Sequence, residues 1–170
     1  MNKLEANRTR AQAISGTGLA ASVPLIQVTW DASPDLEQFL SFISAYTKGR
    51  FSNSLAERVT LASTELLDNA VRYGSLARDF TYQLAVDGSR VLVSAQNTAV
   101  PARIDMLTAQ LRRLESMPDQ VYAAELERSM GAGSGRRSML GLARIRHEAE
   151  MRIDLEVDGT NVTVRAFCTR

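Results

Sequence analysis

The chain has 170 residues, of which 45% are apolar and 23% charged, as expected for one globular domain with its own core. The formal net charge is +1, so no overall field favours nucleic acid or an anionic membrane as a partner. No apolar run approaches the roughly 20 residues of a membrane span, and the single cysteine, Cys168, allows no intrachain disulfide and predicts a reducing, cytoplasmic location.

In the N-terminal third of the chain, the pattern of residues predicts a strand and a helix after a polar segment. Residues 1–22 are small and polar and lack the apolar centre of a signal peptide, so we expect a poorly ordered tail or partner-facing arm before a domain at 23–170. The β-rich run at 25–30 predicts a strand. Ser33 and Pro34 then predict a helix N-cap and first position, and Gly49 predicts the end of that helix.

A second helix has the strongest pattern in the chain. Residues 54–57 match a capping box that begins at Ser54, and Gly74 follows the predicted end. Its apolar residues step by three or four and fall within a sector of roughly 80°, which predicts a core-facing stripe. The stripe consists of Leu55, Val59, Ala62, Leu66, Ala70 and Tyr73.

Two hairpins enclose a helical middle region. Alternating runs at 80–86 and 91–95 flank Asp-Gly at 87–88, and runs at 153–157 and 162–166 flank Asp-Gly at 158–159. Between them we expect helices at 102–116 and 119–130, a glycine-rich stretch at 131–135 and a helix at 138–149. This order predicts an α+β fold, a two-layer sandwich of a mixed, mostly antiparallel sheet with helices on one face.

Three polar residues lie on one flank of the second predicted helix. Glu65 and Asn69 are one turn apart beside the apolar stripe, and Arg72 follows three residues later. A carboxylate, an amide and a guanidinium in this arrangement can act as general base, metal ligand and phosphate contact. The alternative is that they form an ordinary solvated flank.

Residues 65–73, Glu-Leu-Leu-Asp-Asn-Ala-Val-Arg-Tyr, resemble the N box of the GHKL (histidine-kinase-like ATPase) superfamily, which includes sensor-kinase ATPase domains and anti-sigma serine kinases. The resemblance extends from about residue 23 onward, through the order of helices, hairpins and glycine loop. It implies an ATP-binding fold, with Asn69 as the Mg²⁺ ligand, Glu65 as the general base and Arg72 near the phosphates.

The superfamily's adenine-reading motif is altered in this chain. Asn97 occupies the place of the aspartate that reads adenine, and Ala99 and Pro101 replace glycines. An asparagine keeps one carbonyl acceptor, adds donors and has no charge. Two interpretations of Asn97 stay open, as an adenine contact or simply as the end of a strand.

The glycine-rich stretch resembles the superfamily's lid over the phosphates. Backbone N–H groups, a helix N-terminus and adjacent arginines suit a polyphosphate. The residues that this assigns to the nucleotide are Gly133, Gly135, Arg136 and Gly141. A flexible linker is the alternative, and it leaves the neighbouring arginines unexplained.

The inserted region at 102–130 resembles the SiaB-type branch of serine kinases, more loosely than the N box resembles the superfamily. That likeness implies an ATP- and Mg²⁺-dependent protein serine kinase that regulates a small anti-sigma-factor antagonist of the STAS type. A homodimer through the first helix or the sheet face is implied by family likeness only. The alternative is a protein-binding module that keeps the fold without nucleotide or catalysis, which the altered residues 97–101 favour.

Overall fold

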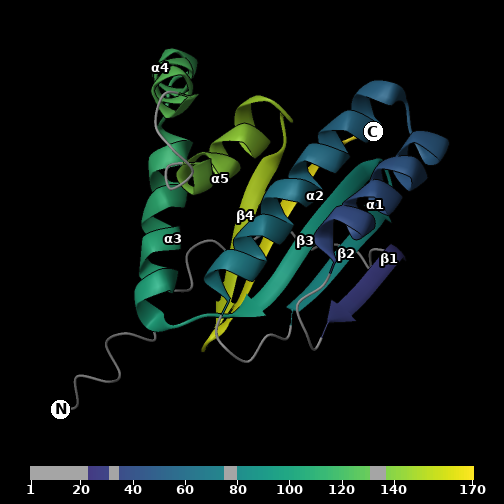
Figure 1. The fold of residues 1–170 in the computed structure, drawn as a ribbon, viewed down its shortest axis with the longest axis horizontal. Coiled ribbons are helices and arrows are strands. Elements are labelled where there is room, and N and C mark those ends of the chain that lie inside the picture. Colours follow the sequence, from purple (N-terminus) through teal and green to yellow (C-terminus); the bar gives the residue numbers. More distant parts are fainter. Residues whose placement is uncertain (1–22, 31–34, 75–79, 131–136) are drawn as a thin grey trace.

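The computed structural model describes residues 23–30, 35–74, 80–130 and 137–170, and the predicted tail at 1–22 lies outside them (Figure 1). The described elements follow the order expected from the sequence. They are β1 (Val23–Trp30), α1 (Leu36–Arg50), α2 (Asn53–Tyr73), β2 (Phe80–Asp87), β3 (Arg90–Thr98), α3 (Pro101–Glu115), α4 (Asp119–Met130), α5 (Arg137–His147), β4 (Arg152–Asp158) and β5 (Asn161–Thr169).

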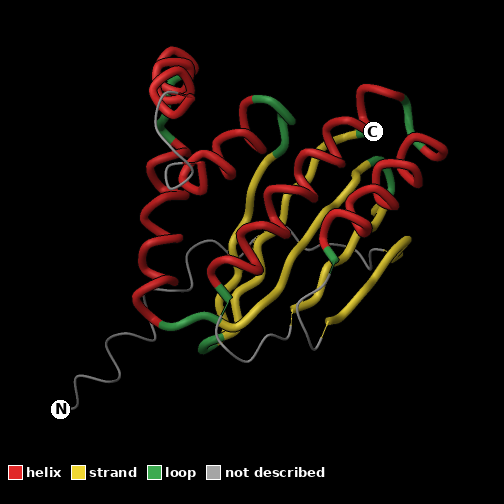
Figure 2. The backbone as a smooth tube through the Cα atoms, in the orientation of Figure 1, coloured by secondary structure: helices red, strands yellow, loops and turns green. Residues whose placement is uncertain are grey.

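The strands form one sheet in the order β1-β2-β3-β5-β4. All four pairings are antiparallel, so the described sheet lacks the parallel pair that a mixed sheet would have. Helices α1, α2 and α5 lie over one face of it (Figure 2). The predicted α+β sandwich is confirmed.

Both Asp-Gly hairpins form as predicted. Gly88 has φ 56° and Gly159 has φ 61°, backbone conformations that L side chains adopt rarely. Each glycine therefore closes a tight turn whose twist matches the flanking strands. The turns set the register within each hairpin. Across all five strands the register forms one inward row: Val28, Tyr82, Ala95, Val164 and Leu155.

Helix α2 supplies the centre of the core. Five of the six predicted stripe residues are buried, and Tyr73 at the end of the helix is half-buried. Beneath the helix, the fully buried Tyr82 hydroxyl lies 2.8 Å from Ser63 Oγ. Ser63 also donates to the Val59 carbonyl at 2.7 Å. The buried polar atoms are thus paired, as burial requires.

The helix starts differ from the expectation. Helix α1 is capped by Asp35, whose side chain accepts the N–H of Gln38 at 3.0 Å, and Ser33 and Pro34 lie outside the described residues. Helix α2 begins at Asn53, and its N-cap is Ser52, two residues before Ser54. The prediction of Ser54 was wrong because several short polar side chains stand in a row, and any of them has an oxygen able to cap.

Helices α3 and α4 lie beside the sandwich rather than over the sheet. In Figure 1, α3 runs beside the β4 side of the molecule and α4 lies beyond α5. Pro101 takes the first position of α3, where its missing N–H costs no helical bond. Among the described helices, none is long and apolar enough to cross a lipid bilayer.

Candidate functional site

Glu65 is a buried acid on α2. Only 9% of the residue is exposed, although its neighbours on the same flank reach solvent more freely. Such burial of a carboxylate is uncommon unless the charge is paired. Glu65 is therefore not part of a solvated flank.

The partner of Glu65 comes from α5. Arg144 Nη1 donates to Glu65 Oε1, and the Nε of the same guanidinium donates to Glu148 Oε2 at 3.1 Å. On α4, the Tyr122 hydroxyl donates to Glu148 Oε1. The four side chains connect α4, α5 and α2 in one continuous chain of polar contacts.

The pKa values of the two carboxylates that share Arg144 are shifted in opposite directions. Burial raises the pKa of Glu65 above its ordinary value of 4.5, an effect that the charge of Arg144 opposes but does not cancel. Burial also acts on Glu148, but hydrogen bonds from Tyr122 and Arg144 hold the pKa of Glu148 below 4.5.

Gly141 lies directly over the Glu65–Asn69 turn. A Cβ built on Gly141 would lie 2.7 Å from Glu65 Oε2 and 3.6 Å from Asn69 Nδ2. A side chain at this position would meet the carboxylate, so the glycine permits the first half of α5 to approach α2. The structure therefore brings together three of the predicted site residues, from helices that are far apart in sequence.

Arg72 lies apart from that cluster. The residue is exposed, and its Nη2 pairs with Asp68 Oδ2 at 2.9 Å, one turn earlier on α2. Its carbonyl accepts a hydrogen bond from Arg103 Nη1 at 3.0 Å, and the Arg103 guanidinium lies 5.4 Å from the Tyr73 ring centroid. These contacts attach the start of α3 to the end of α2.

Asn97 closes the C-terminus of α2. Its Nδ2 donates to the Ala70 carbonyl at 2.9 Å, beside the bond of 3.0 Å from the Gly74 N–H to the same oxygen. An aspartate has no proton to donate there at neutral pH. The asparagine therefore has a structural reason to be an amide, and its Oδ1 is the atom left to accept a bond from a ligand.

Gly133, Gly135 and Arg136 lie outside the described residues, so Gly141 is the member of the lid whose surroundings are known.

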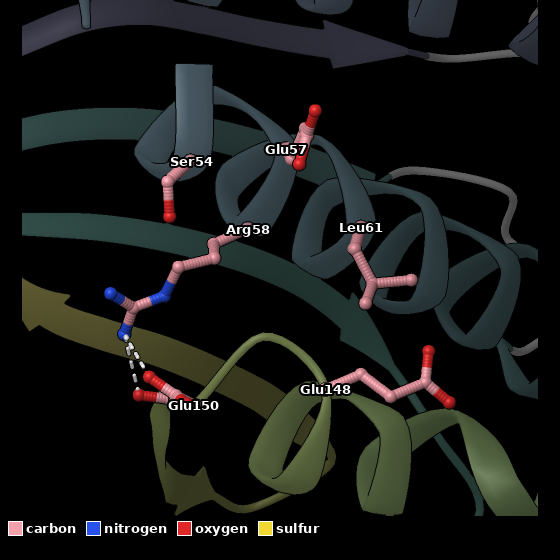
Figure 3. Close-up of a pocket in the computed structure, with 6 residues that line it drawn as sticks. All are labelled: Ser54, Glu57, Arg58, Leu61, Glu148 and Glu150. Carbon is pink, nitrogen blue, oxygen red and sulfur yellow. Dashed lines mark hydrogen bonds and ion pairs between the residues drawn. The ribbon is translucent and has the colours of Figure 1, made fainter. Parts of the chain in front are cut away.

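A shallow depression of about 310 Å³ lies beside the cluster, between α2 and the end of α5 (Figure 3). At one side of it, Arg58 donates from Nε to the Ala149 carbonyl at 2.5 Å and from Nη2 to the Glu150 carbonyl at 2.8 Å. Arg58 thus stabilises the turn between α5 and β4. Glu148 lines the depression as well as holding Arg144, so this hollow adjoins the chain of contacts that leads to Glu65.

Arg144 is a residue of the site that the sequence did not predict. One sign of it was available, because the spacing of Arg144 and Glu148 suits an i,i+4 ion pair on a helix. Its contact with Glu65, 79 residues away in the sequence, had no local sign.

The described residues define an α+β sandwich with a shielded acid between two helices. No family model matches the chain, and no curated protein matches its sequence. Among solved structures, the chain is similar to one in "The crystal structure of SiaB-SiaC complex from Pseudomonas aeruginosa", with TM-score 0.64, 18% identity and 99% of each chain covered. The chain thus has a SiaB-like fold.

Proposed function

We propose that this chain is an ATP- and Mg²⁺-dependent protein serine kinase that regulates a protein partner, an anti-sigma-factor antagonist of the STAS type. The observation that carries the proposal is the meeting of Glu65, Asn69 and Gly141 between α2 and α5. The structural neighbour is a complex of two proteins, which supports a protein as the partner.

The donors in the cluster suit the magnesium and phosphate end of a nucleotide. Asn69 offers an amide oxygen, the kind of hard ligand that Mg²⁺ prefers. Gly141 lies beside Asn69 in the second turn of α5, and the preceding first turn has free backbone N–H groups of the sort that bind phosphate. Asn69 would hold the metal ion, with Gly141, Gly133, Gly135 and Arg136 toward the phosphates. The exposed Arg72 can exchange Asp68 for a phosphate oxygen at little cost, because surface ion pairs are weak.

Glu65 would act as the general base. ATP with Mg²⁺, when bound, supplies the phosphoryl group and the positive charge that steadies it. Glu65 takes the proton of the partner's serine hydroxyl on a carboxylate oxygen as that hydroxyl oxygen becomes the nucleophile. Burial raises the pKa of Glu65, which makes the carboxylate a stronger base than an exposed glutamate.

A second candidate is a partner-binding module without catalysis. Two contacts favour it: the Nδ2 of Asn97 is already bonded to Ala70, and Glu65 is covered by Arg144 and Gly141. In this case the ion pair is a permanent part of the α2–α5 interface.

Calorimetric titration with ATP and Mg²⁺ separates the candidates. For the kinase we expect measurable affinity that falls about tenfold or more in Asn69→Ala, as loss of a metal contact does. Asn161→Ala serves as the matched control, because Asn161 is an exposed residue at the start of β5. If the unmodified chain does not bind ATP, the partner-binding module without catalysis is the candidate that remains.

Phosphate transfer to a STAS protein tests the base. Glu65→Gln keeps the shape of the side chain and removes its basicity, so transfer should be lost while nucleotide affinity is retained. Normal transfer by this variant would show that Glu65 does not accept the proton.

A further inference from the structure

We propose that Arg144 is the positioning residue for Glu65, and that Tyr122 on α4 holds Arg144 in place through Glu148. The inserted helix α4 then controls whether the acid on α2, Glu65, is paired with Arg144. The catalytic meaning of this control rests on the proposed function, whereas the control itself does not.

The shape of the guanidinium makes the coupling directional. Its nitrogens form a rigid planar fork, so an orientation that fixes Nε also fixes where Nη1 points. Glu148 accepts from Nε at 3.1 Å and 3.3 Å, and Nη1 then meets Glu65. Holding Glu148 therefore holds the cation over Glu65.

Tyr122 fixes the other end of this chain. It is 7% exposed, and its hydroxyl donates to the Glu148 oxygen that lies 3.3 Å from Arg144 Nε. The Glu148 side chain is 34% exposed, so without the tyrosine Arg144 still pairs with it but water can compete for its carboxylate. Arg144 has 37% of its side chain exposed and can turn toward solvent together with Glu148, which weakens its contact with Glu65.

Helix α4 packs firmly on the part of α5 that bears these groups. The Tyr122 and His147 rings stack with centroids 4.4 Å apart and planes 10° apart. His147 Nδ1 lies 2.8 Å from Asp119 Oδ1 at the start of α4. Because Tyr122 lies on α4, a displacement of α4 that breaks these contacts also takes Tyr122 away from Glu148.

Release of Arg144 would change the basicity of Glu65. The negative charges of Asp68 and Glu148 act on Glu65 in the same direction as burial. The acid would stay buried but lose the cation that opposes these effects, so its pKa would rise further. A partner protein that binds α4 would in this way produce a stronger base at the site of phosphate transfer. The contact of Tyr122 with Glu148 thus keeps Arg144 on Glu65 until a partner breaks it, and we call this contact the latch.

The test is a pH titration of the Glu65 carboxyl carbon by ¹³C NMR on the full chain without nucleotide. We expect Arg144→Met to shift the midpoint upward and Tyr122→Phe to shift it in the same direction by a smaller amount. Tyr122→Phe changes no charge, so a shift reports the position of Arg144. Tyr46→Phe, which removes a tyrosine hydroxyl on α1, is the control and should titrate as the unmodified chain does.

Hydrogen exchange of the α5 amides accompanies each titration. Unchanged protection with a shifted Glu65 midpoint in Tyr122→Phe supports the latch. An unshifted midpoint in that variant, or a shift accompanied by loss of protection along the whole of α5, overturns it. An unshifted midpoint in Arg144→Met removes Arg144 as the positioning residue. None of these results needs nucleotide, so failure of the kinase proposal in calorimetry would be seen separately.

Discussion

Replacing Asn97 with aspartate tests whether this residue is a structural cap or a degenerate reader of adenine. In the structure its Nδ2 donates to the Ala70 carbonyl at 2.9 Å. Asn97→Asp puts a carboxylate oxygen where the donor was, next to a carbonyl oxygen at the negative end of a helix. If only the superfamily motif is considered, the same change restores the aspartate that the motif has at this position.

The magnitude follows from two unfavourable effects. The Ala70 carbonyl keeps the Gly74 N–H as a partner, so loss of the Asn97 hydrogen bond costs about 0.5–1.5 kcal/mol. A negative charge at a helix C-terminus adds about 0.3–1 kcal/mol. Since Asn97 is half-buried, we expect a loss of about 2 kcal/mol. At about 2–4 °C per kcal/mol for a chain of this size, Tm should fall by about 4–8 °C.

The assay is thermal and urea unfolding from pH 4 to 8. The carboxyl of the variant should have a folded-state pKa above the unfolded value of about 3.9. Its destabilising effect is then complete above the folded pKa and disappears as the pH falls toward the unfolded one. Gln96→Glu is the matched control, since Gln96 is the exposed neighbour on β3 and undergoes the same chemical change. Equal stabilities of Asn97→Asp and the unmodified chain at pH 7 would refute the capping role.

Three further changes test the packing around α2. Ser63→Ala leaves the buried Tyr82 hydroxyl without its partner, whereas Tyr82→Phe leaves Ser63 bonded to Val59. Urea unfolding should therefore show a larger loss of stability for Ser63→Ala, about 1–3 kcal/mol. Arg58→Met removes two hydrogen bonds to carbonyls of the turn between α5 and β4 and should cost about 2 kcal/mol in the same assay. A neutral result would show that Arg58 does not stabilise this turn. Glu65→Gln should gain stability relative to the unmodified chain as pH rises above 4.5, because the folded state holds the Glu65 proton more tightly than the unfolded state. A constant difference in urea midpoint between the two proteins from pH 4.5 to 7 would contradict the raised pKa.

Local patterns were enough to predict much of the fold. The helical stripe that includes Leu66 depends only on residues three and four apart, and the glycines of the two hairpins depend only on the turn that each one makes. Helix starts were less well defined, since Ser52 and Ser54 offer the same capping chemistry two residues apart. That choice depends on where the preceding chain can run.

The candidate site was predictable only in part. The spacing of Glu65 and Asn69 placed them together on one flank of α2, beside the core. Their relation to Gly141 and Arg144 required the packing of α5 on α2, across 79 residues in the case of the ion pair. The bond from Asn97 to Ala70 likewise spans 27 residues.

The amino-acid sequence by itself determined the order of the elements, the two turns, the core face of α2 and the flank that carries the acid. Only the tertiary structure decided that this acid is buried, paired with Arg144 and connected to α4. The reason is physical: periodicity and turn geometry depend on neighbours along the chain, whereas the charge state of a buried carboxylate depends on which distant groups the packing brings within a few ångströms.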